Sequence, residues 1–138
     1  MQNLWNVLLG EDDKNFGLVL KRELEETQQY RVDLAPNGVE TVLRFMENPY
    51  DFVLLDIKMP RLNGNDALKI IKKINPRVSV ITFSGNAGPV EMEESLRCGA
   101  TKCLRKPFSV AQLREEIENH STGLILFAGR NEVLFSKK

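Results

Sequence analysis

The chain has 138 residues, of which 42% are hydrophobic and 28% charged, and its formal net charge is zero. A length near the commonest domain size and an ordinary composition indicate one soluble globular domain. The balanced charge argues against a strongly electrostatic binder of nucleic acid or membranes, because such proteins carry a basic excess. No apolar run approaches the ~20 residues that span a bilayer. Residues 1–6 lack the pattern of a secretory signal, so a cytoplasmic location is expected.

Two cysteines, Cys98 and Cys103, are too few for a disulfide framework. We expect a reducing, intracellular setting in which both thiols act as small buried apolar groups. The only histidine, His120, lies far along the chain, so the sequence gives little support to a zinc site.

Short apolar runs alternate with segments in which apolar residues recur at helical spacing. In chain order, we expect a strand at 7–9, a helix around 16–24, a strand at 31–35, a helix around 39–46, a strand at 52–55, a helix around 67–74, a strand at 78–82, a helix around 90–98, a strand at 101–104 and a helix at 109–119. Turn signals at 36–38, 48–50 and 75–76 separate several of them. Gly99 is expected to end the fourth helix and Ser109 to cap the fifth.

The last residues break this alternation. Residues 123–127 and 133–135 are apolar and flank a turn signal at 129–131. This pattern favours a β-hairpin or an extended appendage at 121–138, after a domain at 1–120. A linker remnant or an added tail is the alternative. An ordered strand pair could cover a surface or pair with another chain.

Strict alternation of strands and helices predicts an α/β fold, with a five-stranded, doubly wound parallel sheet covered on both faces. In such folds ligands bind at the carboxyl ends of the strands. Asp56 closes the third strand, where a carboxylate buried alone would be costly. The residues that follow the other strands should gather at the same edge, and they are Glu11, Asp12, Asp13, Ser84 and Lys106.

Clustered carboxylates repel one another, and a hard divalent cation relieves that repulsion. Mg²⁺ takes oxygen ligands and is commonly held by one or two carboxylates together with waters and a phosphate. Asp12 and Asp56 are the best direct ligands, whereas Glu11 is expected to act through water. The backbone carbonyl of Lys58 could supply a further oxygen.

The same edge carries groups suited to a phosphoryl group. Aspartate can accept a phosphoryl group covalently, which suits Asp56. Lys106 could pair with Asp56 at rest and with a phosphoryl oxygen afterwards, and the Ser84 hydroxyl could donate to another phosphoryl oxygen. Each residue alone has a structural explanation, as a helix-terminal acid, a turn residue or a solvated lysine. Their convergence in one topology favours an acyl-phosphate site.

Several short motifs in register make the chain resemble the receiver domains of two-component response regulators. They are Val-Leu-Leu-Gly-Glu-Asp-Asp at 7–13, Leu-Leu-Asp-Ile-Lys-Met-Pro at 54–60 with Gly64, Ile-Thr-Phe-Ser-Gly at 81–85, Gly-Ala at 99–100 and Lys-Pro-Phe at 106–108. The resemblance covers roughly residues 6–119. It implies a flavodoxin-like, chemotaxis-regulator-like sheet with strand order 2-1-3-4-5.

The resemblance also implies that Asp56 accepts a phosphoryl group from a phosphohistidine on a sensor histidine kinase or a phosphotransfer protein. The site that it implies consists of Mg²⁺ near Glu11, Asp12, Asp56 and the Lys58 carbonyl, and of phosphoryl contacts from Ser84 and Lys106. In the family the serine or threonine moves inward on phosphorylation and an aromatic residue of the fifth strand follows it. The surface offered to partners changes as a result.

The chain departs from the family pattern at a few positions. Cys103 stands where the switch aromatic is usual, and a small side chain cannot report by swinging as a ring does. Signalling would then rely on the loop at 84–88 or on another surface. Gly10 occupies a usually bulkier strand end, which predicts a looser end. Lys58 and Asn86 occupy variable positions that are associated in the family with the lifetime of the phosphoryl group.

These features predict a signalling switch rather than an enzyme, acting through contacts with a downstream protein or output domain. It could form a homodimer, and no direct contact with nucleic acid or a membrane is expected. An alternative is the excised receiver of a longer transcriptional regulator. A phosphatase of the haloacid-dehalogenase type is less favoured, because its second acid would fall at Lys58. A phosphorylation-independent interaction module is a third class, against which the complete acid, serine and lysine set argues.

Overall fold

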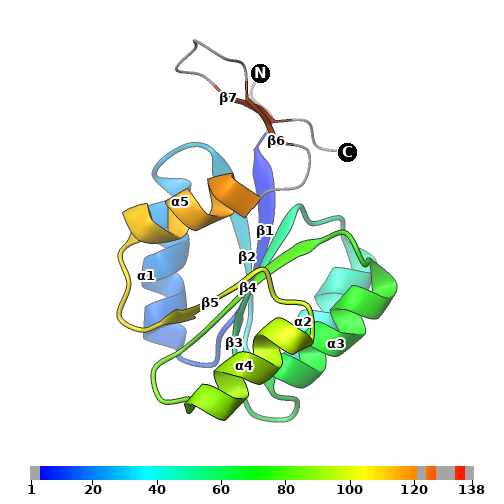
Figure 1. Ribbon diagram of the computed structural model, residues 1–138. Helices are drawn as coiled ribbons and strands as arrows, with labels where there is room; N and C mark the ends of the chain where they lie inside the picture. The colour runs from blue at the N-terminus through cyan, green and yellow to red at the C-terminus, as the bar shows by residue number, and fades with distance from the viewer. Residues whose placement is uncertain (1–3, 121–123, 127–132, 136–138) are drawn as a thin grey trace.

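Five strands and five helices alternate along residues 4–120 of the computed structural model, which describes residues 4–120, 124–126 and 133–135 (Figure 1). The strands are β1 (Trp5–Gly10), β2 (Tyr30–Ala35), β3 (Phe52–Asp56), β4 (Ser79–Ser84) and β5 (Lys102–Arg105). The helices are α1 (Lys14–Glu25), α2 (Gly38–Glu47), α3 (Gly64–Ile74), α4 (Pro89–Arg97) and α5 (Val110–His120). All five strands pair in parallel in the order β2-β1-β3-β4-β5. The predicted doubly wound α/β fold is confirmed.

The side chains of the sheet alternate between two apolar layers, because successive residues of a strand point to opposite faces. Leu9, Leu54 and Phe83 pack with residues of α1 and α5 on one face. Leu8 and Leu55 pack with residues of α2 and α3 on the other face. Every residue of β3 and β4 is buried. The sequence shows this burial as apolar runs without polar alternation, which is typical of central parallel strands.

Strand β4 is longer than predicted. It continues to Ser84 because Phe83 and Ser84 pair with Leu104 and Arg105 of β5. Ser84 is therefore the last residue of a strand rather than a residue of the following loop. Two predicted helix ends are confirmed: Ser109 Oγ accepts the Gln112 N–H at 3.0 Å, and Gly99, at φ +111°, follows α4 in the conformation that favours glycine.

The expectation of a loose strand end at Gly10 is wrong. A Cβ atom built there would lie 2.6 Å from Thr41 Oγ1 and 2.9 Å from Leu55 Cδ2. Gly10 is also paired with Ala35 on one side and with Leu55 on the other. The missing side chain makes room for close packing of α2 on β1, so it tightens the strand end.

The tail contains the strands β6 (Leu124–Leu126) and β7 (Val133–Phe135), which pair antiparallel with Leu124 opposite Phe135 (Figure 1). This arrangement agrees with the predicted hairpin, whereas the turn signal at 129–131 lies outside the described residues. The boundary between a domain at 1–120 and an appendage at 121–138 stays a prediction. Among the helices of the described chain, none has the length and apolar character needed to cross a bilayer.

Candidate functional site

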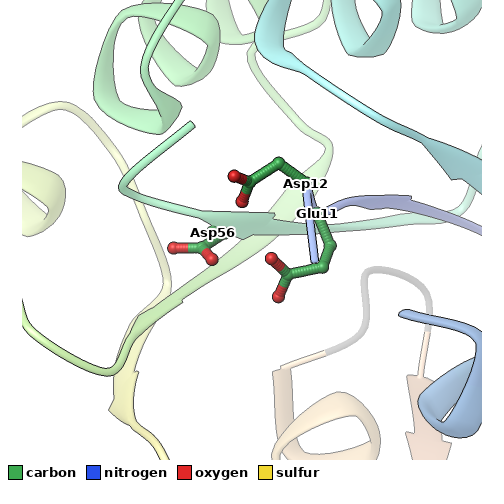
Figure 2. Close-up of side chains that lie close together, drawn as sticks. All are labelled: Glu11, Asp12 and Asp56. Atoms are coloured by element: carbon green, nitrogen blue, oxygen red, sulfur yellow. The ribbon is translucent and has the colours of Figure 1, made fainter. Parts of the chain in front are cut away.

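Three carboxylates meet at the carboxyl ends of β1 and β3 (Figure 2). Glu11 and Asp12 follow β1, and Asp56 is the last residue of β3. One carboxylate oxygen from each of the three residues lies within 4.8 Å of the other two. The convergence that the sequence predicts at this edge of the sheet is therefore present.

Asp56 is held in place by its neighbours on both sides. It is 5% exposed, its Oδ1 accepts the Lys58 N–H at 3.0 Å, and its Oδ2 lies 3.3 Å from Lys106 Nζ. Gly64 begins α3 directly against this backbone, and a Cβ there would overlap the Asp56 carbonyl and lie 2.8 Å from Ile57 Cα. The Gly64 N–H donates to the Ile57 carbonyl at 2.8 Å. A glycine is thus needed for α3 to return to Asp56.

Glu11 is the buried acid of the cluster. Its side chain is fully buried, its Oε1 accepts from Lys106 Nζ at 2.9 Å, and its Oε2 accepts the Asp13 N–H at 3.0 Å. Burial, together with the hydrogen bond to Asp56, raises the pKa of Glu11 to about 7, although Lys106 acts in the opposite direction. A cation in the pocket would favour the charged form of this carboxyl.

The two following acids have different positions. Asp12 is exposed at the mouth of the pocket, which is lined by acids, by Lys58 and Lys106, and by the loop after β4. Asp13 caps α1, because its Oδ1 accepts the Phe16 N–H at 3.1 Å. The cluster as a whole offers oxygen donors only, which is the set that Mg²⁺ prefers. The residues present therefore fit the predicted cation.

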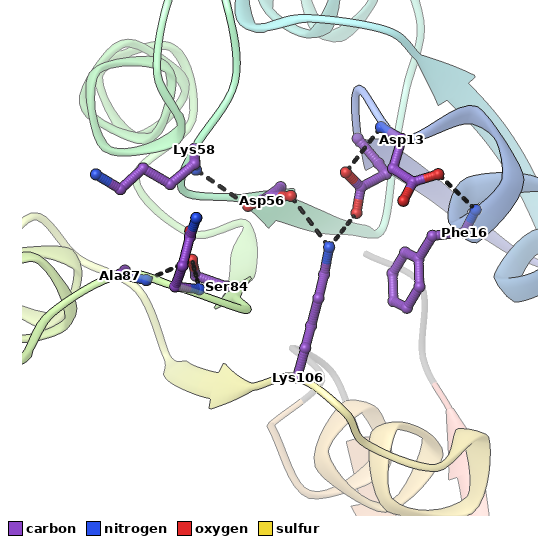
Figure 3. A network of polar contacts seen from close by, with 9 residues as sticks. Asp13, Phe16, Asp56, Lys58, Ser84, Ala87 and Lys106 are labelled. Atoms are coloured by element: carbon purple, nitrogen blue, oxygen red, sulfur yellow. Dashed lines mark hydrogen bonds and ion pairs between the residues drawn. The ribbon is translucent and has the colours of Figure 1, made fainter.

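Lys106 bridges the two buried acids (Figure 3). Burial alone would lower the pKa of this ammonium, but the hydrogen bond to Glu11 and the charge of Asp56 outweigh it and the pKa is raised. The ammonium also lies 4.2 Å from the centroid of the Phe16 ring. Lys106 is therefore a fixed positive charge at the carboxylate that is predicted to be phosphorylated.

Ser84 lies at the end of β4 and is 1% exposed. Its Oγ accepts the N–H groups of Asn86 at 3.3 Å and of Ala87 at 3.0 Å (Figure 3). Its carbonyl accepts the Lys106 N–H at 3.0 Å, so the pairing of β4 with β5 positions both residues. The hydroxyl is thus tied to the loop that follows β4, and its contact with a phosphoryl group stays a prediction.

Cys103 lies on β5 opposite Thr82 of β4. Both Cys103 and Cys98 are free thiols and half-buried, which is less burial than we expected. The Thr82 hydroxyl is buried, and it has no hydrogen-bond partner among the described residues. The role of Cys103 in switching stays a prediction.

Sequence reasoning missed the partner of the Lys58 side chain. Lys58 Nζ lies 2.6 Å from Oε2 of Glu91 on α4. It also missed Asn65, whose Nδ2 donates to the Glu91 carbonyl at 3.1 Å. The sequence does contain a signal for the start of α4, because Gly88, Pro89 and Glu91 form a capped helix start and Glu91 Oε1 accepts the Gly88 N–H. This signal does not predict the pairing with Lys58.

Comparison with known families decides the identity of the fold. A family model described as the response regulator receiver domain matches residues 7–118. The chain belongs to this family. As a receiver domain it is a signal-transduction module of two-component systems. Its fold is that of the family, with five parallel strands in the order found here.

Individual relatives agree with this assignment. The chemotaxis protein CheY of Thermotoga maritima is 32% identical over 111 residues, which are 80% of this chain and 92% of that protein. The transcriptional regulatory protein RprY of Bacteroides fragilis is 30% identical over 118 residues, which are 86% of this chain but only 50% of RprY. The chain thus spans about half the length of that relative.

A solved structure has a similar fold and a bound cation. It is the receiver domain of the sensor histidine kinase PA1611 from Pseudomonas aeruginosa PAO1, with a magnesium ion coordinated in the active site cleft. It is 28% identical, has a TM-score of 0.77, and the match covers 86% of this chain and 98% of that chain.

Proposed function

We propose that this receiver domain is a phosphorylation-dependent switch in which Asp56 accepts the phosphoryl group. The observation that carries the proposal is the sharing of one ammonium, that of Lys106, between Asp56 and the buried Glu11. The Lys106 ammonium, 3.3 Å from Asp56 Oδ2, stabilises the carboxylate at rest and can stabilise a phosphoryl oxygen after transfer. The donor is a phosphohistidine on a sensor kinase or a phosphotransfer protein, and the setting is the cytoplasm.

In the transfer step, a carboxylate oxygen of Asp56 forms a bond to phosphorus while the P–N bond of the donor breaks. The electron pair of that bond stays on the imidazole nitrogen, so atoms and charge balance. The Lys58 N–H and the Lys106 ammonium contact different oxygens of Asp56 and fix the orientation of the carboxylate. Such positioning, together with charge stabilisation, is most of what phosphoryl transfer requires of a protein.

Magnesium would be held by Asp12, Asp56 and the Lys58 carbonyl, with Glu11 acting through water. When bound, the cation neutralises charge on the phosphoryl group during transfer. The Glu11 side chain is fully buried and paired with Lys106, whereas Asp12 is exposed at the mouth of the pocket. This difference supports a direct role for Asp12 and an indirect one for Glu11.

Ser84 would donate its hydroxyl hydrogen to a phosphoryl oxygen. Its Oγ now accepts two N–H groups of the loop after β4, so an inward movement of Ser84 would release them. This coupling supports a route to the surface through residues 84–88, which does not need a large ring at Cys103. The altered surface would act on a downstream protein, on an output domain or on a second copy of the chain.

A second candidate is a receiver that belongs to a longer transcriptional regulator. The similarity to RprY favours this candidate, because RprY is a transcriptional regulatory protein and the chain matches 50% of its length. The same phosphoacceptor site would then control an attached output domain, and the test below applies to both cases.

The test is labelling with acetyl phosphate and Mg²⁺, followed by intact mass. We expect wild type to gain one phosphoryl group and Asp56→Asn to gain none, because the amide is not a comparable nucleophile. Asp13→Asn is the matched control: it alters a neighbouring acid that serves as a helix cap and should still be labelled.

Two results would contradict the proposal. Labelled Asp56→Asn protein would place the acceptor elsewhere. An unchanged mass of wild type, with partner binding intact, would favour a phosphorylation-independent module. Steady turnover of a phosphomonoester by the isolated chain would instead favour a phosphatase.

A further inference from the structure

The Lys58 side chain lies next to the phosphoacceptor but is held by another element. Its backbone N–H donates to Asp56 Oδ1, and the residue lines the acidic pocket. Its ammonium nevertheless extends away from Asp56 (Figure 3) and lies 2.6 Å from Glu91 Oε2 in the first turn of α4. The backbone and the side chain of Lys58 thus join the site to α4.

Glu91 makes two contacts with one carboxylate. While Oε2 pairs with Lys58, Oε1 accepts the Gly88 N–H at 2.9 Å and closes the start of α4. Among the described residues of α4, no apolar side chain is fully buried, and the buried residue is Ser95, which donates to Asn65 Oδ1. Asn65 also donates to the Glu91 carbonyl. A change in charge near Lys58 therefore acts on a helix that has little apolar anchoring.

The balance of charge in the pocket would change on phosphorylation. Lys106 already serves both Asp56 and Glu11. A phosphoryl group carries nearly two negative charges, and because the Asp56 carboxylate gives up its own charge on forming the anhydride, the pocket gains about one. Lys58 is the other cation among the residues that line the pocket. The side chains of the Lys58–Glu91 pair are 48% and 39% exposed. Exposed pairs of this kind shift an equilibrium by at most about fivefold, so a stronger negative charge can take the ammonium from Glu91.

We propose that Glu91 is a positioning residue that holds the Lys58 ammonium on α4, and that a phosphoryl group on Asp56 draws this ammonium away. The inference rests on the proposed function of Asp56. Release of Lys58 adds a cation to the phosphoryl group and removes one of the contacts that hold the first turn of α4. Helix α4 thereby responds to phosphorylation of Asp56, and this response does not require an aromatic residue in place of Cys103.

The test uses beryllofluoride with Mg²⁺, which occupies the acceptor carboxylate as a phosphoryl group does, and follows amide hydrogen exchange in residues 90–97. In wild type, beryllofluoride should raise exchange there by about two- to fivefold, in line with loss of an exposed ion pair. Lys58→Met should abolish this change. Glu91→Gln keeps an oxygen for the Gly88 N–H and should show raised exchange before beryllofluoride is added.

The chain offers a matched control in the Lys69–Glu94 pair, which joins α3, rather than the loop after β3, to α4 and has a similar exposure of 50% and 41%. Glu94→Gln should respond to beryllofluoride as wild type does. Beryllofluoride affinity, measured by fluorine NMR on the same samples, should be about two- to fivefold tighter in Glu91→Gln, because Lys58 is already free. It should be unchanged in Glu94→Gln.

The two proposals fail in different ways. If wild type does not bind beryllofluoride, the acceptor role of Asp56 is wrong. If wild type binds it but α4 does not respond, or if Lys58→Met responds equally, the acceptor role stands and the Lys58–Glu91 relay is wrong. Glu91→Gln that matches Glu94→Gln in both exchange and affinity also rejects the relay.

Discussion

Helices α4 and α5 flank β5 on opposite faces of the sheet, and different forces attach them (Figure 1). Leu113 and Ile117 of α5 are at most 1% exposed and pack with α1 and the sheet. On α4, by contrast, Val90 is 71% and Leu96 is 50% exposed. Hydrogen bonds and ion pairs join α4 to α3 and to the loop after β3.

The difference shows which helix can respond to chemistry at Asp56. The stabilisation that a helix gains by burying apolar surface is roughly proportional to the area removed from water, and it does not depend on nearby charge. Ion pairs and hydrogen bonds to charged groups do depend on it. Helix α5 therefore serves as a fixed frame, whereas α4 is attached by contacts that a new negative charge can alter.

The largest expected effect compares one leucine from each helix. Leu113→Ala should lower the free energy of unfolding by about 2–5 kcal/mol, because it removes a fully buried side chain from the core. Leu96→Ala should change it by less than about 0.5 kcal/mol, since Leu96 is half-exposed. Urea unfolding measures both. Similar losses in the two variants would break the distinction between the helices.

A smaller effect is expected for the buried polar contact that holds α4. Ser95→Ala leaves Asn65 Oδ1 without its donor and should cost about 1–3 kcal/mol in urea unfolding. A double-mutant cycle with Asn65→Ala isolates the pair. Strictly additive losses would mean that the Ser95–Asn65 contact does not hold α4 to α3.

The smallest effect concerns Glu25 of α1, a polar contact on the face of the sheet that α1 and α5 cover. Burial opposes ionisation of this carboxyl, but the Val32 N–H and Lys21 Nζ, each 2.9 Å away, outweigh it and lower its pKa. The folded pKa lies below the unfolded value of 4.5, so the stabilisation is present above pH 4.5 and is lost as the pH falls through the folded pKa.

Glu25→Gln should therefore lower the free energy of unfolding by about 0.5–1.5 kcal/mol at neutral pH and have little effect in strong acid. Chemical unfolding of both proteins at the two pH values measures the difference. Lys14→Gln, which changes an exposed charge at the start of the same helix, is the control. A cost for Glu25→Gln that is the same at both pH values would contradict the assignment.

The core and the acidic pocket could be predicted because both follow from local patterns. Apolar runs without alternation fixed the central strands, and parallel topology then required Asp56 and Lys106 to meet at one edge. The partner of Lys58 could not be predicted in this way. A long exposed side chain pairs with whatever charge tertiary packing brings near, and the position of α4 leaves no periodic signal in the residues around Lys58.

Gly10 and Ser84 show a second limit. Gly10 was expected to loosen β1, but the atoms that fill its space come from α2 and β3, so only the packed structure shows why no side chain fits. Ser84 was expected just after β4, but its pairing with Arg105 extends the strand through it. Strand ends are decided by the neighbouring strand as much as by their own residues.

The placement of the two free thiols has a practical consequence. Cys98 is the C-cap of α4 and Cys103 lies within β5, so the native chain carries one sulfhydryl on each side of the turn that joins them. The rates at which these two thiols are alkylated report on how often the structure around that turn opens to solvent. The rate at Cys98 relative to Cys103 can be followed in the unaltered protein, without an engineered label.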